Sequence, residues 1–164
     1  MTAVWVAVLV AVVGLAYYGM WSGWRNRGRR NAVPEPRWLD EGSLTIEESI
    51  PATYVSTTTA GNWLDRITAH GLGAISKSSL AVGDGALLVQ RRGARGFAIP
   101  GADILAVARA QGIAGKVRDK EGLIVITWRL GSSELDTGVR PSHKADVERV
   151  ERLVAELMEG ATHG

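Results

Sequence analysis

The chain has 164 residues, with 19 basic and 17 acidic side chains and no cysteine. Without cysteine there are no disulfides, no thiolate chemistry and no cysteine-based metal site. Residues 41–164 carry 14 Lys and Arg against 15 Asp and Glu, so the body of the chain is nearly neutral. Its charge therefore gives no reason to expect a nucleic-acid partner.

The first 24 residues contain no charged side chain, and residues 3–21 form a run of 19 that also lacks Asn, Gln and Pro. As a helix this run would be about 28 Å long, close to the hydrocarbon thickness of a bilayer. A helix that is apolar on every side needs lipid or a large core around it, and the remaining chain is too short to supply that core. We therefore predict a transmembrane helix over residues 1–24 with its core at 3–21. A cleaved signal peptide fits less well, because bulky residues follow the run and no basic residue precedes it.

The residues that flank this run predict its orientation. Four arginines follow it and no Lys or Arg precedes it, so the positive-inside rule places the amino terminus outside and the remaining chain in the cytoplasm. Aromatic residues stand near both ends, as in an interfacial belt. The predicted membrane-interface residues are Trp5, Tyr17, Tyr18, Trp21, Trp24, Arg25, Arg27, Arg29 and Arg30. The expected location is the cell membrane, with the bilayer as one partner; the arginines either set topology only or also bind anionic headgroups.

The segment after the apolar run is predicted to connect it to a folded domain. Residues 25–48 form a basic juxtamembrane segment and linker, in which Pro34 and Pro36 keep the chain extended. One domain of ordinary size then follows over residues 49–160.

The domain is predicted to begin with a strand and an excursion. β-Branched and aromatic residues predict a strand at residues 50–58, where alternation puts Tyr54 and Thr57 on opposite faces. Residues 61–73 interrupt this pattern. Their apolar spacing predicts a short helix that ends at two glycines.

Short strands then follow in hairpin succession. Residues 78–82 and 86–92 flank a Gly-Asp-Gly sequence at 83–85, which predicts a tight hairpin because glycine supplies the positive φ of the turn. Further strands are predicted at residues 97–99 and 103–109, although the alanines of the second segment also allow a helix.

The last third of the chain has the clearest periodicity. Residues 123–130 alternate as the strongest strand, and residues 134–139 alternate with their acidic side chains, Asp136 among them, pointing outward. Residues 142–159 place apolar side chains at helical spacing, so we expect an amphipathic helix that stops at Gly160.

Seven short strands followed by one amphipathic helix predict an α+β domain, a half-barrel or sandwich whose open end the helix covers. The order of these parts, together with the sequences at 51–55, 61–67, 69–73, 112–116 and 135–138, resembles a known family. It is that of actinobacterial single-pass membrane proteins with a bacterial pleckstrin-homology-like (PH-like) domain, some of which bear an export or transporter label. The resemblance implies a seven-stranded PH-like fold with a capping helix.

Residues suited to catalysis do not form a recognisable constellation. The three histidines lack metal-ligand spacing, and the sequence at 112–116 lacks the spacing and the Ser or Thr of a phosphate-binding loop. We therefore expect no enzyme activity, no cofactor and no metal, and consider a binding role. The candidate binding residues lie in or beside loops: Arg66, His70, Lys77, Arg91, Arg92 and Arg95. The alternative for each is ordinary solvated loop charge.

Two functions fit these observations. The first is a non-catalytic, membrane-anchored PH-like module that presents a protein-binding surface to an unidentified partner at the cytoplasmic face, through an exposed strand edge or the loop at 59–77. Tethering would raise its effective concentration near the membrane. The alternative is an accessory subunit of a membrane transporter or envelope complex, assembled through its transmembrane helix, where Gly14 and Gly19 allow close packing.

Overall fold

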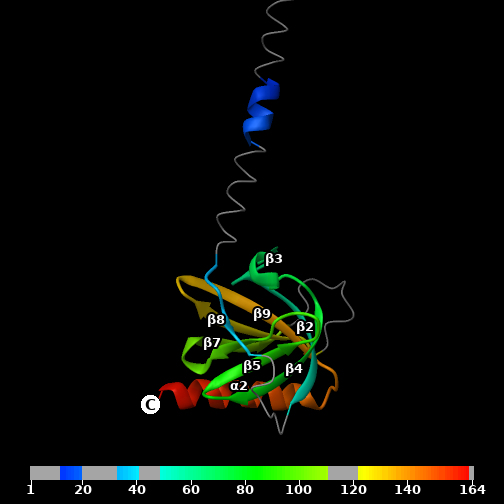
Figure 1. Ribbon diagram of the computed structural model, residues 1–164, viewed down its shortest axis with the longest axis vertical. Coiled ribbons are helices and arrows are strands. Elements are labelled where there is room, and N and C mark those ends of the chain that lie inside the picture. Colours follow the sequence, from blue (N-terminus) through cyan, green and yellow to red (C-terminus); the bar gives the residue numbers. More distant parts are fainter. Residues whose placement is uncertain (1–11, 20–32, 41–48, 111–121, 163–164) are drawn as a thin grey trace, which may run out of the picture. The chain divides into compact units, whose positions relative to one another are not determined.

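The computed structural model describes residues 12–19, 33–40, 49–110 and 122–162, and the chain divides into two units, Met1–Ala32 and Val33–Gly164 (Figure 1). In the first unit residues 12–19 are helical and all are exposed. No helix within the described ranges is long and apolar enough to cross a bilayer. Most of the predicted transmembrane segment and all of the arginines that follow it lie outside those ranges.

The second unit is built on an antiparallel sheet, which holds nine strands in the described part of the chain. The strands are β1 (Arg37–Trp38), β2 (Ile50–Thr59), β3 (Asn62–Arg66), β4 (Ser76–Gly83), β5 (Ala86–Arg91), β6 (Phe97–Pro100), β7 (Ile104–Arg109), β8 (Ile124–Leu130) and β9 (Ser133–Pro141). They run in the order β1-β6-β5-β4-β2-β9-β8-β7, and β3 pairs with β2 beside this path. Seven of them are the predicted strands, and β1 and β3 are additional.

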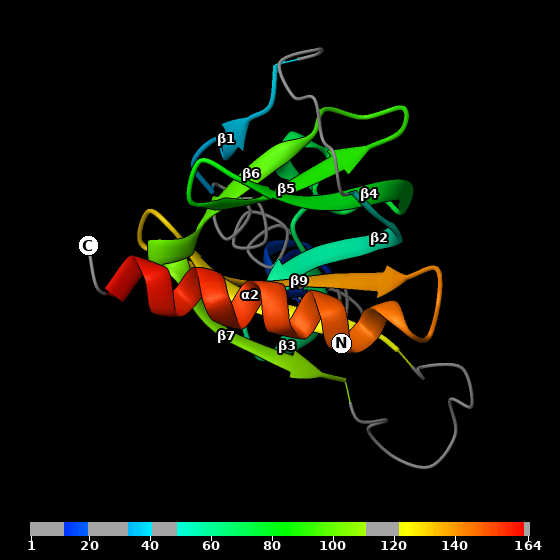
Figure 2. The ribbon, with the colours of Figure 1, turned by 90° about the horizontal axis from the view of Figure 1, so that it is seen from below.

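The carboxy-terminal helix α2 (Asp146–Thr162) lies across one end of the curved sheet (Figure 2). The sheet has one half that runs from β1 to β4 along this order and another that runs from β2 to β7. The helix packs against β5 of the first half, against β7 and β9 of the second half, and against the short helix η2 (Gly101–Asp103). Its buried side includes Val147, Val150 and Val154. The predicted amphipathic helix therefore covers the open end of the sheet, because only that contact removes its apolar stripe from water.

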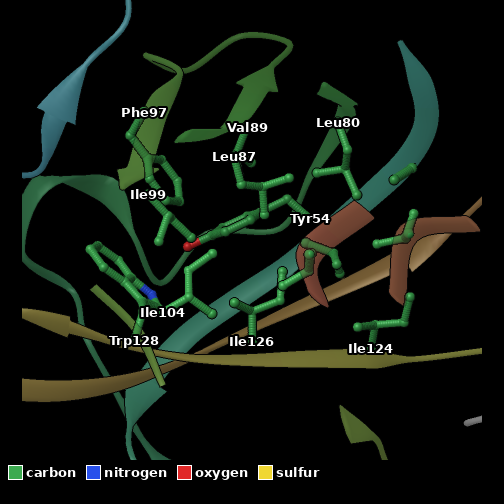
Figure 3. Close-up of a cluster of buried hydrophobic side chains, with 14 of the residues drawn as sticks. Tyr54, Leu80, Leu87, Val89, Phe97, Ile99, Ile104, Ile124, Ile126 and Trp128 are labelled. Carbon is green, nitrogen blue, oxygen red and sulfur yellow. The ribbon is translucent and has the colours of Figure 1, made fainter. Parts of the chain in front are cut away.

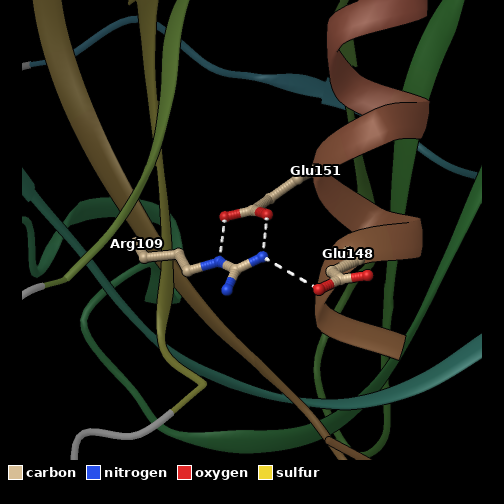
Figure 4. Close-up of polar contacts among 3 residues, drawn as sticks. All are labelled: Arg109, Glu148 and Glu151. Carbon is tan, nitrogen blue, oxygen red and sulfur yellow. Dashed lines mark hydrogen bonds and ion pairs between the residues drawn. The ribbon is translucent and has the colours of Figure 1, made fainter. Parts of the chain in front are cut away.

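An ion pair also joins α2 to the edge strand β7. Arg109 donates from Nε to Glu151 Oε1 at 2.7 Å and from Nη2 to Glu151 Oε2 at 2.6 Å (Figure 4). Glu148 lies 3.9 Å from the same Nη2. The hydrogen bonds to Glu151 raise the pKa of Arg109. Because this guanidinium is exposed, solvent screens the pair and its contribution to stability is small.

The core lies between the two halves of the sheet and the helix (Figure 3). Its aromatic centre joins strands from both halves. The ring of Phe97 on β6 meets the ring of Tyr54 on β2 edge-on, with centroids 5.9 Å apart, and stacks on Trp128 of β8 at 6.1 Å. All three side chains are fully buried. These contacts hold the two halves of the sheet at a fixed distance.

The β4–β5 hairpin confirms the turn predicted from the Gly-Asp-Gly sequence. Gly83 pairs with Ala86, which leaves a two-residue turn. Both turn residues have positive φ, 51° at Asp84 and 68° at Gly85. This conformation matches the twist of the flanking strands, and Asp-Gly adopts it at little cost.

The helix predicted over residues 61–73 is wrong. β3 turns back on β2 through a two-residue turn at Gly61, and the one-turn helix η1 (Ala69–Gly71) follows. β2 pairs with β4 only as far as Tyr54, so its last residues offer a free edge to β3. A helix between the two glycine-containing turns would be short and would leave many of its own backbone groups unpaired, whereas the strand gains ladder hydrogen bonds.

Residues 33–39, predicted as part of the linker, belong to the second unit. β1 adds to the edge of β6, and Val33 is buried in the core. A Cβ placed on Gly131, in the β8–β9 turn, would lie 2.9 Å from Pro34, so these two residues are packed together. The segment thus bridges β6 and the β8–β9 turn, which are distant along the sheet.

Two side chains of the sheet lie in surroundings that simple alternation does not predict. Thr57 is buried beside Tyr54, because an irregularity between Tyr54 and Ser56 shifts the register with β9. Asp136 was predicted to point outward and is only 7% exposed. The β2–β3 hairpin covers it, and the N–H of Gly61 donates to its Oδ2 at 2.9 Å.

The limits of α2 also differ from the predicted 142–159. The β9 ladder extends through Pro141, and the N–H of Ser142 still donates to the carbonyl of Pro51 at 2.8 Å. The helix therefore begins only at Asp146. It continues past Gly160, because a glycine ends a helix only where the chain turns away from the axis.

Candidate functional site

A basic cleft of ≈ 600 Å³ lies on the sheet between β2, β4, β5 and the loop after β9. Polar side chains dominate its lining, and within the described residues no carboxylate contributes to it. The lining residues are Pro51, Ala52, Thr53, Lys77, Ser78, Ser79, Gln90, Arg91, Arg92 and Ser142.

Strand register places the cations of the cleft side by side. Thr53 pairs with Arg140 on one side and with Lys77 on the other, and the N–H of Arg92 donates to the carbonyl of Lys77 at 2.8 Å. Directly paired residues of antiparallel strands project from the same face. Lys77 and Arg92 therefore form a row of two basic side chains in the cleft, and Arg140 projects from the same face of the sheet outside the cleft lining. Like charges in such neighbouring positions destabilise a sheet, so the row has a physical cost that an anionic ligand would offset.

Hydroxyl and amide groups extend the row. Ser79 pairs with Gln90 two positions along from Lys77, on the same face of the sheet. Ser142 lines the cleft from the loop after β9. The lining thus combines two exposed cations with neutral donors, which suits a carboxylate or phosphate ligand. Among the described residues of the lining there is no histidine or carboxylate that would serve as a general base.

Arg91 lines the cleft, but most of its side chain is buried beneath it. Its side chain is only 8% exposed, and its guanidinium carbon lies 5.0 Å from the Tyr54 ring centre and 5.5 Å from that of Phe97. Nε donates to the carbonyl of Arg95 and Nη1 to that of Gly71, both at 2.9 Å. Burial lowers the pKa of Arg91. It therefore ties the β5–β6 turn and the η1 loop to the core.

A chain of buried hydrogen bonds holds the same loop. Trp128 Nε1 donates to Thr137 Oγ1 at 2.8 Å, Thr137 and Thr57 hydroxyls are 2.8 Å apart, and Thr57 and Tyr54 hydroxyls are 2.7 Å apart. Tyr54 donates to the carbonyl of Leu72 at 2.6 Å. Because an indole only donates and a carbonyl only accepts, every hydroxyl in the chain must point the same way. Burial raises the pKa of Tyr54 to about 12, which keeps this donor protonated.

Trp38 of β1 is held between two of the predicted basic residues. The Arg95 guanidinium carbon lies 4.7 Å from the Trp38 ring centre, and the His70 ring meets it edge-on at 6.1 Å. His70 has φ of 57° and places Nε2 3.0 Å from the carbonyl of Val33. These contacts fasten the entering chain to the domain.

A sequence profile of the bacterial PH domain-like family matches residues 33–155. The chain belongs to this family. PH-like domains serve in general as non-catalytic modules that bind proteins or lipids, which agrees with the lining of the cleft. A search of the curated proteins finds no match.

The PH-like domain brings some of the predicted site residues together and separates others. Lys77, Arg91 and Arg92 line the basic cleft, whereas His70 and Arg95 pack on Trp38. Arg66 lies at the end of β3, away from the cleft lining. Of the predicted membrane-interface residues, only Tyr17 and Tyr18 lie within the described ranges, and both are exposed.

Sequence reasoning missed the neutral side of the cleft. Thr53, Ser79, Gln90 and Ser142 carry no charge and have no motif of their own. Alternation along β4 would have put Ser79 on the face of Lys77, but only the register between strands shows that Thr53 and Gln90 join them.

Proposed function

We propose that this protein is a non-catalytic, membrane-anchored PH-like module that presents its basic cleft to an acidic segment of a partner protein at the cytoplasmic face of the cell membrane. The observation that carries this proposal is the row formed by Lys77 and Arg92 beside hydroxyl and amide donors, with no carboxylate among the described residues of the cleft lining. Opposite charge on the partner would relieve the repulsion within the row and steer its approach.

The anchor is supported by the sequence and by the exposed surface of the amino-terminal helix. Residues 3–21 are long enough to span a bilayer, and four arginines follow them. Within residues 12–19 the large apolar side chains stay exposed: Val12, Val13, Leu15, Tyr17 and Tyr18. Exposed apolar side chains gathered in this way mark a surface that contacts a membrane or another protein. Anchoring holds the domain near membrane-associated partners and raises its effective concentration there.

Charge reversal in the cleft tests the binding role. The full chain would be recovered from gently solubilised membranes as wild type, as Lys77→Glu with Arg92→Glu, and as Arg129→Glu with Arg152→Glu. Arg129 and Arg152 are also exposed but lie outside the cleft. We expect the wild type and the control pair to retain a partner that the cleft variant loses by about tenfold or more. Equal recovery by all three proteins would contradict the proposal.

Two further measurements test the anchor and separate the two functions. We expect the full chain to resist alkaline extraction from membranes and a carboxy-terminal tag to be protected from external protease.

Replacing residues 3–21 with an unrelated spanning helix should leave partner recovery unchanged if the cleft binds the partner. Loss of the partner after this exchange would instead favour a subunit that assembles through its helix.

A further inference from the structure

The two most exposed large apolar side chains described in the second unit lie in one excursion. Leu64 is 95% exposed and Ile75 is 69% exposed, and both belong to the segment between β2 and β4. The next most exposed, Val82, reaches 43% and lies on the β4–β5 hairpin beside the end of α2. A single exposed apolar residue needs no explanation, but two such residues belong to this one excursion, which makes the excursion the candidate for a contact surface.

This excursion is fixed in place rather than loosely attached. Thr59 Oγ1 donates to Asp65 Oδ2 at 2.9 Å, directly beside Leu64. Asp136 holds the hairpin turn at Gly61, and the carbonyls of Gly71 and Leu72 receive Arg91 and Tyr54. The excursion therefore holds Leu64 at the surface, which lowers the cost of ordering this segment on binding.

The excursion lies at the end of the domain where the chain enters. His70, within the excursion, contacts the carbonyl of Val33, the first described residue of the second unit. In Figure 1 β3 and α2 lie at opposite ends of the domain. Only eleven residues separate Trp21, the last residue of the apolar run, from Val33. Their contour limits that separation to about 40 Å.

Charge beside Leu64 suits a membrane surface. Alternation along β3 puts Arg66 on the same exposed face as Leu64. Exposed apolar side chains with neighbouring cations are the combination that enters the boundary between headgroups and acyl chains of an anionic leaflet.

We propose that Leu64 and Ile75 contact the bilayer surface, so that the domain rests on the membrane by its entry end and directs α2 away from it. This inference rests on the membrane anchor of the proposed function. It commits to lipid as the occupant, because the apolar tips lie next to the point where a short tether leaves the domain. A protein partner at this surface is the alternative that the experiment must exclude.

The absence of cysteine allows a direct test with the full chain in liposomes of neutral and anionic lipid. Leu64→Cys, Ile75→Cys and the control Val82→Cys would each carry an environment-sensitive fluorophore. We expect the labels at 64 and 75 to shift their emission to the blue and to be quenched by spin-labelled lipid about twofold or more above the label at 82. Adding Leu64→Glu to the Ile75→Cys chain should reduce that quenching, with the unfolding midpoint unchanged because Leu64 is exposed.

The possible failures are distinguishable. If the chain does not float with the liposomes, the anchor of the proposed function is wrong, and this inference is overturned with it. If the chain floats but the labels at 64 and 75 are quenched no more than the label at 82, only the present proposal is overturned. A shift seen in native membranes and absent from protein-free liposomes would assign the surface to a protein partner and would likewise overturn it.

Discussion

The end of the domain under α2 and the end where the chain enters are closed by different chemistry. Under α2 an apolar stripe that includes Val150 and Val154 covers the sheet. At the entry end a directed chain of hydroxyls and a buried guanidinium hold the η1 loop. Apolar contacts tolerate small changes of geometry, whereas buried hydrogen bonds lose their value when one partner is missing. The two ends should therefore respond differently to mutation and to pH.

The largest expected effect comes from Phe97, which lies in the core between the two ends. Phe97→Ala removes a ring that meets Tyr54 edge-on and stacks on Trp128. We expect it to lower the free energy of unfolding by about 3–5 kcal/mol, as for other buried aromatic truncations. Denaturant unfolding checks this value. Loss of hydrogen-exchange protection at one end alone would show that the two ends do not share a core.

The next largest effect is expected from a pH titration of stability, which reports on the entry end because the Tyr54 hydroxyl belongs to its hydrogen-bond chain. Burial raises the pKa of Tyr54 from 10.0 to about 12. Since the pKa is higher in the folded state, the stabilisation is complete below pH 10 and is lost as the pH rises from about 10 to 12, by about 2–3 kcal/mol in total. Tyr54→Phe should start with lower stability at pH 8 and show a smaller decline above pH 10. An equal decline in both proteins would contradict this assignment.

A matched pair of smaller substitutions sharpens the contrast. Thr137→Val keeps the shape but breaks the hydroxyl chain, and Val154→Ala shortens the helix stripe. Each should lower the unfolding free energy by about 1–2 kcal/mol. We expect amide exchange near Leu72 to accelerate more in the first variant and exchange in α2 more in the second. The same exchange pattern in both would remove the distinction between the ends.

The smallest effect is expected at the ion pair between β7 and α2. Arg109→Gln and Glu151→Gln each break a bidentate contact that is partly exposed. Solvent screening should leave the thermal midpoint nearly unchanged, and high salt should reduce the wild-type value toward that of the variants. A large drop in the midpoint would show that this pair, rather than the apolar stripe, holds α2 in place.

Elements with a strong local signal were predicted well. The Asp-Gly turn of the β4–β5 hairpin depends on the φ preferences of its own two residues. The β8 and β9 strands and the stripe of α2 follow from side-chain periodicity. The sequence did not predict β3 and β1, because each is short and is ordered by the free edge of a neighbouring strand rather than by its own residues.

The sequence by itself determined the apolar amino-terminal run, the succession of strands and the amphipathic closing helix, because periodicity and turn residues act over a few neighbouring positions. Only the tertiary structure decided that Arg91 is buried under two rings while Lys77 and Arg92 share a cleft. It also decided that the hydroxyls of Thr57 and Thr137, 80 positions apart, form one chain. Such outcomes depend on strand register and on a bulge, and these are set by the packing of the whole sheet.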